Sequence, residues 1–227
     1  VPLGINAGDM LFAKAYEAAL RAQRNVKPGR LFKALDVITE ATITVCEGQA
    51  LDMAFEGKMK VTEREYMDMV AKKTAALLVA SACVGAIAGG GKSYEVARLG
   101  RAVRASGLAF QMVDDILGLT ADEKVLGKPV GSDIREGKRT LIVIHGLNHA
   151  KKLQSETILR ALGNRNASLE EITKAVNTLK SLGSIDYVAA KAEAFNQRAK
   201  SELRIFPSSN ACERLLTLFD YIVERKY

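Results

Sequence analysis

Helical patterns run through almost the whole sequence, and they constrain the fold more than any other feature. Apolar side chains recur at steps of three and four residues over residues 9–24 and 31–55. Thr62 and Ser168 each begin a capping box, in which a glutamate three residues later helps to satisfy the first turn of a helix. No stretch of useful length shows the two-residue period of a strand. The sequence therefore predicts an all-α protein.

Caps and breakers divide the rest of the chain into further helices. Glycines 89–91 are expected to end the helix that Thr62 begins, and Ser93 is expected to cap the next one. The further helices are expected over residues 62–88, 93–119 and 140–152, after Gly183 and after Asn210, with a loop over residues 120–139. Because no repeat or linker is visible, residues 1–227 are expected to form a single-domain bundle of long, mostly antiparallel helices around a central cleft.

Composition limits the classes of function. The net charge of +7 would suit nucleic acid, a membrane surface or a small polyanion as partner. Aromatic residues make up only 6% and the basic residues are scattered, so a nucleic-acid partner is not expected. The apolar run over residues 75–88 falls short of a membrane span, so no stable membrane insertion is expected. The three cysteines lack the CxxC spacing of a zinc site and indicate a reducing, cytoplasmic location.

Residues 110–138 contain two adjacent aspartates followed by a loop with lysines, and this stretch is the candidate for a functional site. Gln111, Asp114 and Asp115 lie at steps that place them on adjoining parts of one helix face. Buried carboxylates are costly unless they are paired or bound to a metal, and Mg²⁺ commonly binds one or two of them together with substrate phosphates. Lys128 and Lys138 follow in a glycine-rich loop, and their ammonium groups suit phosphate. A pair of aspartates alone would favour an ordinary exposed turn, whereas the whole arrangement favours a diphosphate–Mg²⁺ clamp.

The same stretch resembles the second aspartate-rich motif of the trans-isoprenyl diphosphate synthases. That motif reads F-Q-x-x-D-D-x-x-D, followed by G-K-x-x-G-x-D and a further lysine. The matching residues are Phe110, Gln111, Asp114, Asp115, Gly127, Lys128, Gly131, Asp133 and Lys138. In F-Q-x-x-D-D-x-x-D, the position of the third aspartate is occupied here by Gly118. Asp122, about one turn later, is considered as a substitute for that aspartate.

Two shorter matches extend the resemblance. GQALD at residues 48–52 resembles the family's GQxxD, and Lys73 with Thr74 resembles its KT pair. The resemblance implies that Gln49, Asp52, Lys73 and Thr74 contact the allylic diphosphate or its metals. Without the resemblance, Gln49 and Asp52 fit the polar end of a core helix equally well, and Lys73 with Thr74 fits a solvated turn better.

The resemblance implies the isoprenoid synthase fold and a prenyltransferase that uses Mg²⁺. Such an enzyme condenses isopentenyl diphosphate with an allylic diphosphate through an allylic carbocation. Asp114 and Asp115 are implied as metal ligands, and Lys73, Lys128 and Asp114 as the catalytic residues. The further substrate-binding residues that it implies are Gln49, Asp52, Thr74, Gln111 and Lys138.

The family's first aspartate-rich motif, DDxxD, is not found in this sequence. The resemblance therefore implies an N-terminally truncated synthase, so that either the rest is a separate piece or this chain alone is inactive. A homodimer is expected, and the wording of residues 114–138 resembles archaeal geranylgeranyl diphosphate synthases, which implies a C20 product. The alternative is a non-catalytic partner subunit of a prenyl diphosphate synthase, which Gly118 and the absent motif would also fit.

Overall fold

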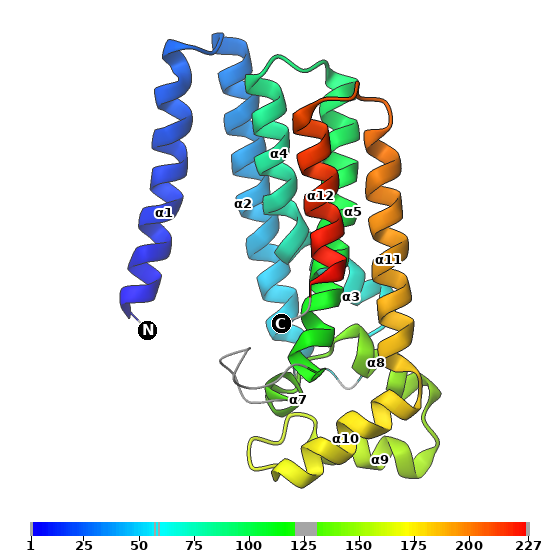
Figure 1. Ribbon diagram of the computed structural model, residues 1–227. Helices are drawn as coiled ribbons and strands as arrows, with labels where there is room; N and C mark the ends of the chain where they lie inside the picture. The colour runs from blue at the N-terminus through cyan, green and yellow to red at the C-terminus, as the bar shows by residue number, and fades with distance from the viewer. Residues whose placement is uncertain (1, 57, 59, 121–130, 226–227) are drawn as a thin grey trace.

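The computed structural model describes residues 2–56, 58, 60–120 and 131–225 (Figure 1). These residues contain no strand, which confirms the all-α prediction. The α-helices are α1 (Pro2–Arg21), α2 (Pro28–Glu56), α3 (Glu63–Val70), α4 (Ala76–Ala88), α5 (Ser93–Thr120), α7 (Ser132–Glu136), α8 (Leu141–His149), α9 (Lys152–Ala161), α10 (Leu169–Ser181), α11 (Ser184–Leu203) and α12 (Asn210–Glu224). A 3₁₀ turn, Ala22–Arg24, follows α1, and a π-helical segment, Ala71–Ala75, joins α3 to α4 without a break.

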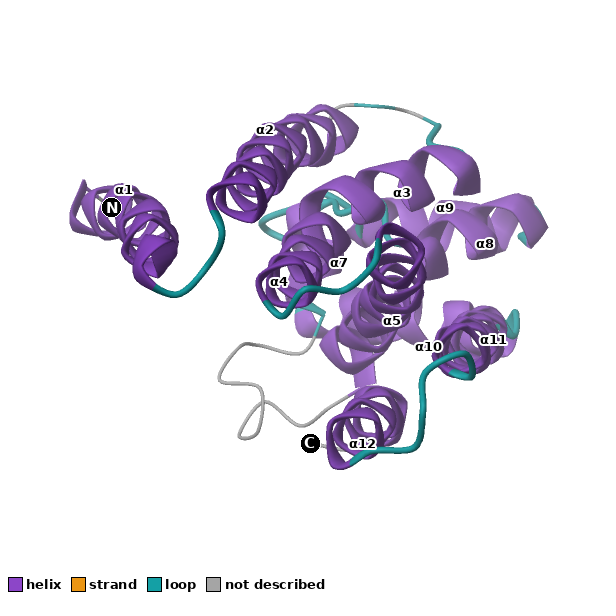
Figure 2. Cartoon of the chain, turned by 90° about the horizontal axis from the view of Figure 1, so that it is seen from above, coloured by secondary structure: helices purple, strands orange, loops and turns teal. Residues whose placement is uncertain are grey.

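The long helices stand side by side, with α5 at the centre of the group (Figure 1, Figure 2). α5 packs against α4, α11 and α12, and its side chains are fully buried at Ala102, Ala109 and Met112. The short helices α9 and α10 lie below the lower end of α5 in Figure 1, and α7 and α8 pack against that end. α1 stands apart beyond α2, to which a 2.7 Å hydrogen bond between Tyr16 and Thr39 joins it.

The larger hydrophobic cluster holds the lower half of α5 in place. It brings together residues of α3, α5, α8 and α10, among them Tyr66, Met112, Ile142 and Leu179. Each of these side chains is almost completely removed from water, and burying a side chain of this kind contributes about 1.5–3 kcal/mol. The end of α5 that carries the paired aspartates is therefore fixed between α3 and α8.

Both predicted capping boxes form. At Thr62 the side-chain hydroxyl accepts from the backbone N–H of Glu65 at 3.2 Å, and the Glu65 carboxylate accepts from the Thr62 N–H at 2.8 Å. Ser168 and Glu171 make the same reciprocal pair at the start of α10. The predicted cap at Ser93 is wrong, since Ser93 is the first helical residue. The carboxylate of Glu95 accepts from the backbone N–H of Lys92, just before the helix, at 2.6 Å.

The helix expected over residues 140–152 is α8, which ends at His149, and the next helix, α9, was not expected. Ala150 between them adopts an extended backbone conformation with φ −72° and ψ 138°. No glycine or proline marks this break, so the apolar pattern alone extended the helix too far. The loop expected over residues 120–139 also contains the short helix α7.

The continuous helix Glu63–Ala88 is long and apolar enough to cross a membrane by length and composition alone. The core helix of a protein without a membrane span passes the same test, and this helix packs against α2 and α5. The sequence analysis expected this region to be too short for a membrane span. It considered only the apolar run over residues 75–88 and not the whole helix.

The capping box at Thr62 starts the helix that leads into the π segment. Thr62→Ala is expected to lower the free energy of unfolding by about 1 kcal/mol, because the backbone N–H of Glu65 loses its acceptor. Urea unfolding followed by circular dichroism measures this change. Thr173→Ala, an exposed position inside α10, is the control and should shift stability by less than about 0.5 kcal/mol. Equal effects of the two substitutions would contradict the role of the cap.

Candidate functional site

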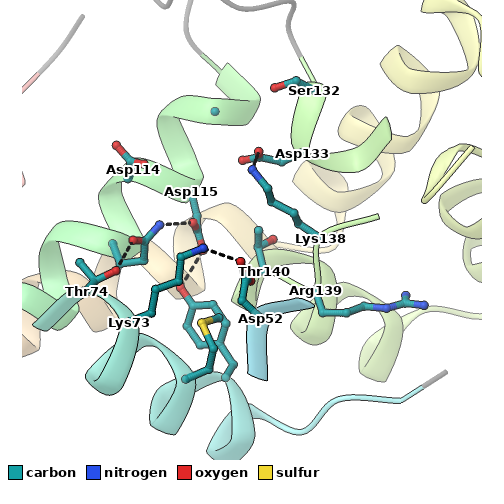
Figure 3. A pocket seen from close by; sticks show the side chains of 14 residues that line it. Asp52, Lys73, Thr74, Asp114, Asp115, Ser132, Asp133, Lys138, Arg139 and Thr140 are labelled. Atoms are coloured by element: carbon teal, nitrogen blue, oxygen red, sulfur yellow. Dashed lines mark hydrogen bonds and ion pairs between the residues drawn. The ribbon is translucent and has the colours of Figure 1, made fainter. Parts of the chain in front are cut away.

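A cavity of 390 Å³ lies at the lower end of α5 (Figure 3). Its walls come from α2, α3, the π segment, α5, α7 and the start of α8. Seven of the residues predicted for the site line it: Asp52, Lys73, Thr74, Gln111, Asp114, Asp115 and Lys138. Residues that are 86 positions apart in the sequence, from Asp52 to Lys138, therefore meet in one place.

Three other predicted positions are not part of this lining. Gln49 is exposed on α2 and is not among the cavity residues. Lys128 and Asp122 lie outside the described residues. The functional roles of all the predicted site residues stay predictions.

The π segment brings Lys73 and Thr74 to the same cavity. Adjacent residues of a regular α-helix point about 100° apart, and the wider π turn reduces this angle. A Cβ atom on Gly48 would lie 2.3 Å from the backbone nitrogen of Lys73, so the two backbones touch and only glycine fits there. This contact places Asp52, one turn further along α2, in an ion pair with Lys73.

A chain of hydrogen bonds runs from the π segment to Asp115. The hydroxyl of Thr74 donates to the side-chain oxygen of Gln111 at 2.8 Å, which turns the amide nitrogen of Gln111 toward Asp115. That nitrogen donates to one carboxylate oxygen of Asp115 at 2.9 Å, and the hydroxyl of Tyr66 donates to the other at 2.6 Å. Asp115 is only 6% exposed, and both of its oxygens have a donor.

Burial raises the pKa of Asp115 to about 7. The nearby charges of Asp133 and Asp114 raise this pKa further, while the hydrogen bonds from Tyr66 and Gln111 lower it. Burial, followed by the charge of Asp115, likewise raises the pKa of Tyr66 well above its usual value. A cation bound near Asp115 would therefore reduce the electrostatic repulsion between its carboxylate and those of Asp114 and Asp133.

Asp114 lies on the open side of the cavity. Its side chain is 53% exposed, and one carboxylate oxygen lies 3.3 Å from the guanidinium of Arg225, which comes from the segment after α12. The same guanidinium lies over the ring of Phe110 at 4.2 Å. Asp115 is thus buried and hydrogen-bonded, whereas Asp114 is accessible to a ligand that enters from solvent.

Lys138 reaches the cavity from the other side. Its ammonium lies 2.5 Å from Oδ1 of Asp133 and 3.1 Å from Glu136. Burial lowers the pKa of Lys138, but the hydrogen bonds and charges of Asp133 and Glu136 outweigh burial and raise it. Lys138 is therefore a fixed positive charge beside the carboxylates of α5 (Figure 3).

The donor set fits Mg²⁺ bound jointly with a phosphate ligand. Within the described ranges, no three His, Cys, Asp or Glu side chains are close enough to hold a metal by themselves. Mg²⁺ usually binds one or two carboxylates, several waters and substrate phosphates rather than a cage made only of protein. Asp114 and Asp115 offer the carboxylates, and Lys73 and Lys138 offer the positive charge that a phosphate requires.

Sequence reasoning gave no role to several residues that line the cavity, among them Tyr66, Asp133 and Arg139. Tyr66 stands seven residues before Lys73, a spacing of two helical turns that could have placed it on the same face. Asp133 belongs to the quoted motif, but its position relative to α5 depends on the fold. The guanidinium of Arg139 extends away from the carboxylates in Figure 3.

Comparison with known proteins gives concordant matches. The family model described as "Polyprenyl synthetase" matches residues 1–179. The chain is 42% identical to a short chain isoprenyl diphosphate synthase of Methanothermobacter thermautotrophicus, over 100% of this chain and 68% of that protein. It is 45% identical to a geranylgeranyl diphosphate synthase of Sulfolobus acidocaldarius, over 89% of this chain and 61% of that protein.

Solved structures agree with these sequence matches. The crystal structure of geranylgeranyl pyrophosphate synthetase from Pyrococcus horikoshii superimposes with a TM-score of 0.90 at 45% identity, over 100% of this chain and 68% of that chain. A polyprenyl synthase from Caulobacter crescentus, complexed with calcium and isoprenyl diphosphate, gives a TM-score of 0.89 at 29% identity. The chain spans 61 to 68% of the length of these four relatives.

The raised pKa of Asp115, about 7, predicts that mild acid stabilises the folded chain when no divalent metal is present. An aspartate in the unfolded chain has a pKa of about 3.9, so the folded state binds this proton more tightly. The free energy of unfolding should therefore gain up to about 1.4 kcal/mol from this group for each pH unit as the pH falls from 7 toward 4. Urea unfolding at pH 8, 7, 6 and 5 measures this gain.

Asp115→Asn should remove this contribution. The exposed Asp114→Asn should retain most of it, because burial, and not the charge of Asp114, is the main cause of the raised pKa. The difference between Asp115→Asn and the wild-type chain measures the contribution of Asp115. Parallel pH profiles for Asp115→Asn and the wild-type chain would contradict the assigned burial of the Asp115 charge.

Proposed function

Because the chain belongs to the polyprenyl synthetase family, whose members are prenyltransferases, we propose that the protein condenses isopentenyl diphosphate with an allylic diphosphate. The product is a longer all-trans prenyl diphosphate. Relatives named geranylgeranyl diphosphate synthases support geranylgeranyl diphosphate as that product. Other relatives are named geranylfarnesyl diphosphate synthases, so the length of the product is an outcome of the assay.

One observation on this chain itself supports the proposal most directly. Three separate segments of sequence, around Asp52, Lys73 and Asp114, supply their motif side chains to a single cavity in which acids and lysines face each other. An acidic cluster suits a metal and a lysine pair suits phosphate, so together they suit a metal–diphosphate complex.

The proposed reaction begins when the bond between the allylic carbon and its diphosphate breaks. The diphosphate leaves with the electron pair, the double bond of isopentenyl diphosphate attacks the allylic cation, and the adduct then loses a proton. Lys73 and Lys138 contact the departing diphosphate and stabilise the negative charge that develops on it. Asp114 and Asp115 would hold Mg²⁺, which when bound would supply further positive charge to the same group.

The hydrogen-bonded side chains keep these groups in position. Thr74 and Gln111 orient Asp115 through the bonds that link them, and Asp52 holds the ammonium of Lys73 at the cavity wall. The apolar prenyl chain is expected to lie between helices of the bundle, where apolar side chains can exclude water from it. Lys128 and Gln49 are kept as further substrate-binding candidates.

The comparisons favour an enzyme over the alternative of a non-catalytic partner subunit, since the named relatives are synthases. We further propose that residues 1–227 belong to one domain and that the protein is a cytoplasmic homodimer with no stable membrane insertion and no nucleic-acid partner. Large exposed side chains on α1 and α2, including Leu11, Phe12 and Phe32, support contact with a second copy.

A pair of neighbouring lysines provides a sharp test. Lys73→Met is expected to lower kcat/KM for prenyl transfer at least about a hundredfold, because the departing diphosphate loses a fixed positive charge. The measurement follows labelled isopentenyl diphosphate into product with farnesyl diphosphate and Mg²⁺. Lys72→Met is the matched control, since Lys72 pairs with Glu47 at 3.2 Å and with Asp68 at 3.5 Å and does not line the cavity.

Equal effects of the two lysine substitutions would contradict the proposed role of the cavity. A folded wild-type protein that makes no prenyl diphosphate would instead support the partner-subunit alternative. Removal of Mg²⁺ with a chelator should abolish turnover, and its return should restore it.

A further inference from the structure

A second cavity, of 640 Å³, lies at the opposite end of the bundle from the paired aspartates. Its walls are the first turns of α2, the end of α4, the connection that follows α4 and the first half of α5, at the top of Figure 1. Arg101 in this cavity and Asp114 in the other are thirteen residues apart on α5, or about 20 Å along the helix. No residue lines both cavities, so they are separate sites.

Basic side chains from two helices surround the second cavity. Arg30 and Lys33 come from α2, and Arg101 and Arg104 come from α5, whereas none of the described residues that line it is acidic. Arg101 lies 3.2 Å from the carboxylate of Glu202. The other three make no ion pair within the described part of the chain, unlike the paired lysines of the first cavity. Three positive charges therefore meet here without a negative partner among these residues.

The place of Arg30 and Lys33 in α2 makes their charges unfavourable for the protein alone. Both stand in the first two turns, where the helix dipole favours negative charge, and the first turn of α2 has no acid. A Cβ atom on Gly90, whose φ is 86°, would lie 2.7 Å from both terminal nitrogens of Arg30, so this guanidinium fills the space beside the glycine. An anion bound between α2 and α5 would reduce the repulsion between these charges.

The floor of the cavity is apolar. Val79, Cys83 and Ile87 come from α4, and Val96 comes from α5. Cys83 is buried, and burial raises the pKa of its thiol, so this side chain carries no charge at neutral pH. A ligand that fills the cavity therefore needs a negative group for the basic side chains and an apolar part for the floor.

We propose that this cavity is a second binding site, for an amphiphilic phosphate or diphosphate. Arg30, Lys33 and Arg104 contact the phosphate oxygens, and the apolar part of the ligand lies on Val79 and Ile87. Because no carboxylate of the described residues lines the cavity, this ligand binds without a divalent cation. A prenyl diphosphate has the required chemistry, and its choice as the probe rests on the proposed function.

Equilibrium dialysis of labelled farnesyl diphosphate against the whole chain, with a chelator present, tests the proposal. The wild-type chain should bind the probe, and the Kd should rise with ionic strength. Lys33→Gln and Arg104→Gln should each raise the Kd about tenfold, because each removes a charge-assisted hydrogen bond. These two positions are chosen in place of Arg30, whose contact with Gly90 also supports the fold.

Two further variants separate the cavity from general charge at this end of the bundle. Lys92→Gln removes a positive charge that does not line the cavity, and it should leave the Kd within about twofold. Ala97→Phe keeps every charge and places a ring at an exposed lining position, and it should raise the Kd at least about tenfold by filling the cavity. Circular dichroism confirms that each variant is folded before binding is compared.

Several outcomes would overturn the proposal. One is an unchanged Kd in folded Lys33→Gln and Arg104→Gln, or in folded Ala97→Phe. Another is inorganic diphosphate that binds as tightly as farnesyl diphosphate, since the apolar floor would then have no role. Binding to phosphatidylglycerol vesicles without binding of soluble farnesyl diphosphate would assign these charges to a membrane surface instead.

The chelator separates this proposal from the proposed function. Metal-free binding that Lys73→Met abolishes but Arg104→Gln leaves intact would place the probe in the first cavity and overturn only the second site. Metal-free binding that depends on Lys33 and Arg104, in a folded chain that makes no prenyl diphosphate with Mg²⁺, would support the second site and contradict the proposed function.

Discussion

The burial of one carboxyl group, that of Asp115, determines how the rest of the site is arranged. A buried carboxylate is costly unless every oxygen has a donor, and here Tyr66 and Gln111 fill that requirement. The amide of Gln111 can donate to Asp115 because the hydroxyl of Thr74 holds its oxygen. The geometry of the π segment is in this way passed through two hydrogen bonds, from Thr74 to Gln111 and from Gln111 to Asp115, to the acid on α5. Changes in the π segment should therefore alter the acidic face even where they do not touch it.

Opposite charges are already paired across the cavity before any ligand arrives. Lys73 is paired with Asp52, Lys138 with Asp133, and Arg225 with Asp114. A metal–diphosphate complex carries both signs of charge, so it can take over the partners on each side. In the proposed complex, the acids would turn to the cation and the lysines to the phosphate, so that little net charge would be buried without compensation. The paired arrangement explains how a protein can keep so many charges close together and remain folded.

The sequence was sufficient for the class of fold, for most helices and for seven of the residues that line the cavity. Capping boxes at Thr62 and Ser168 are local signals, and they formed as predicted. Three features depended on packing instead. The π segment has no composition of its own, the break at Ala150 has no glycine or proline, and the close approach of Asp133 to Gly118 joins residues fifteen positions apart. Periodicity that assumes regular helices cannot register such features.

A structure of this chain with Mn²⁺ and inorganic diphosphate, with the metal located by anomalous scattering, tests the central claim most directly. The account predicts a metal position beside Asp114 and Asp115, with diphosphate oxygens next to Lys73 and Lys138. Diphosphate ordered at another place on the surface, with the cavity free of metal at saturating concentrations, would contradict it.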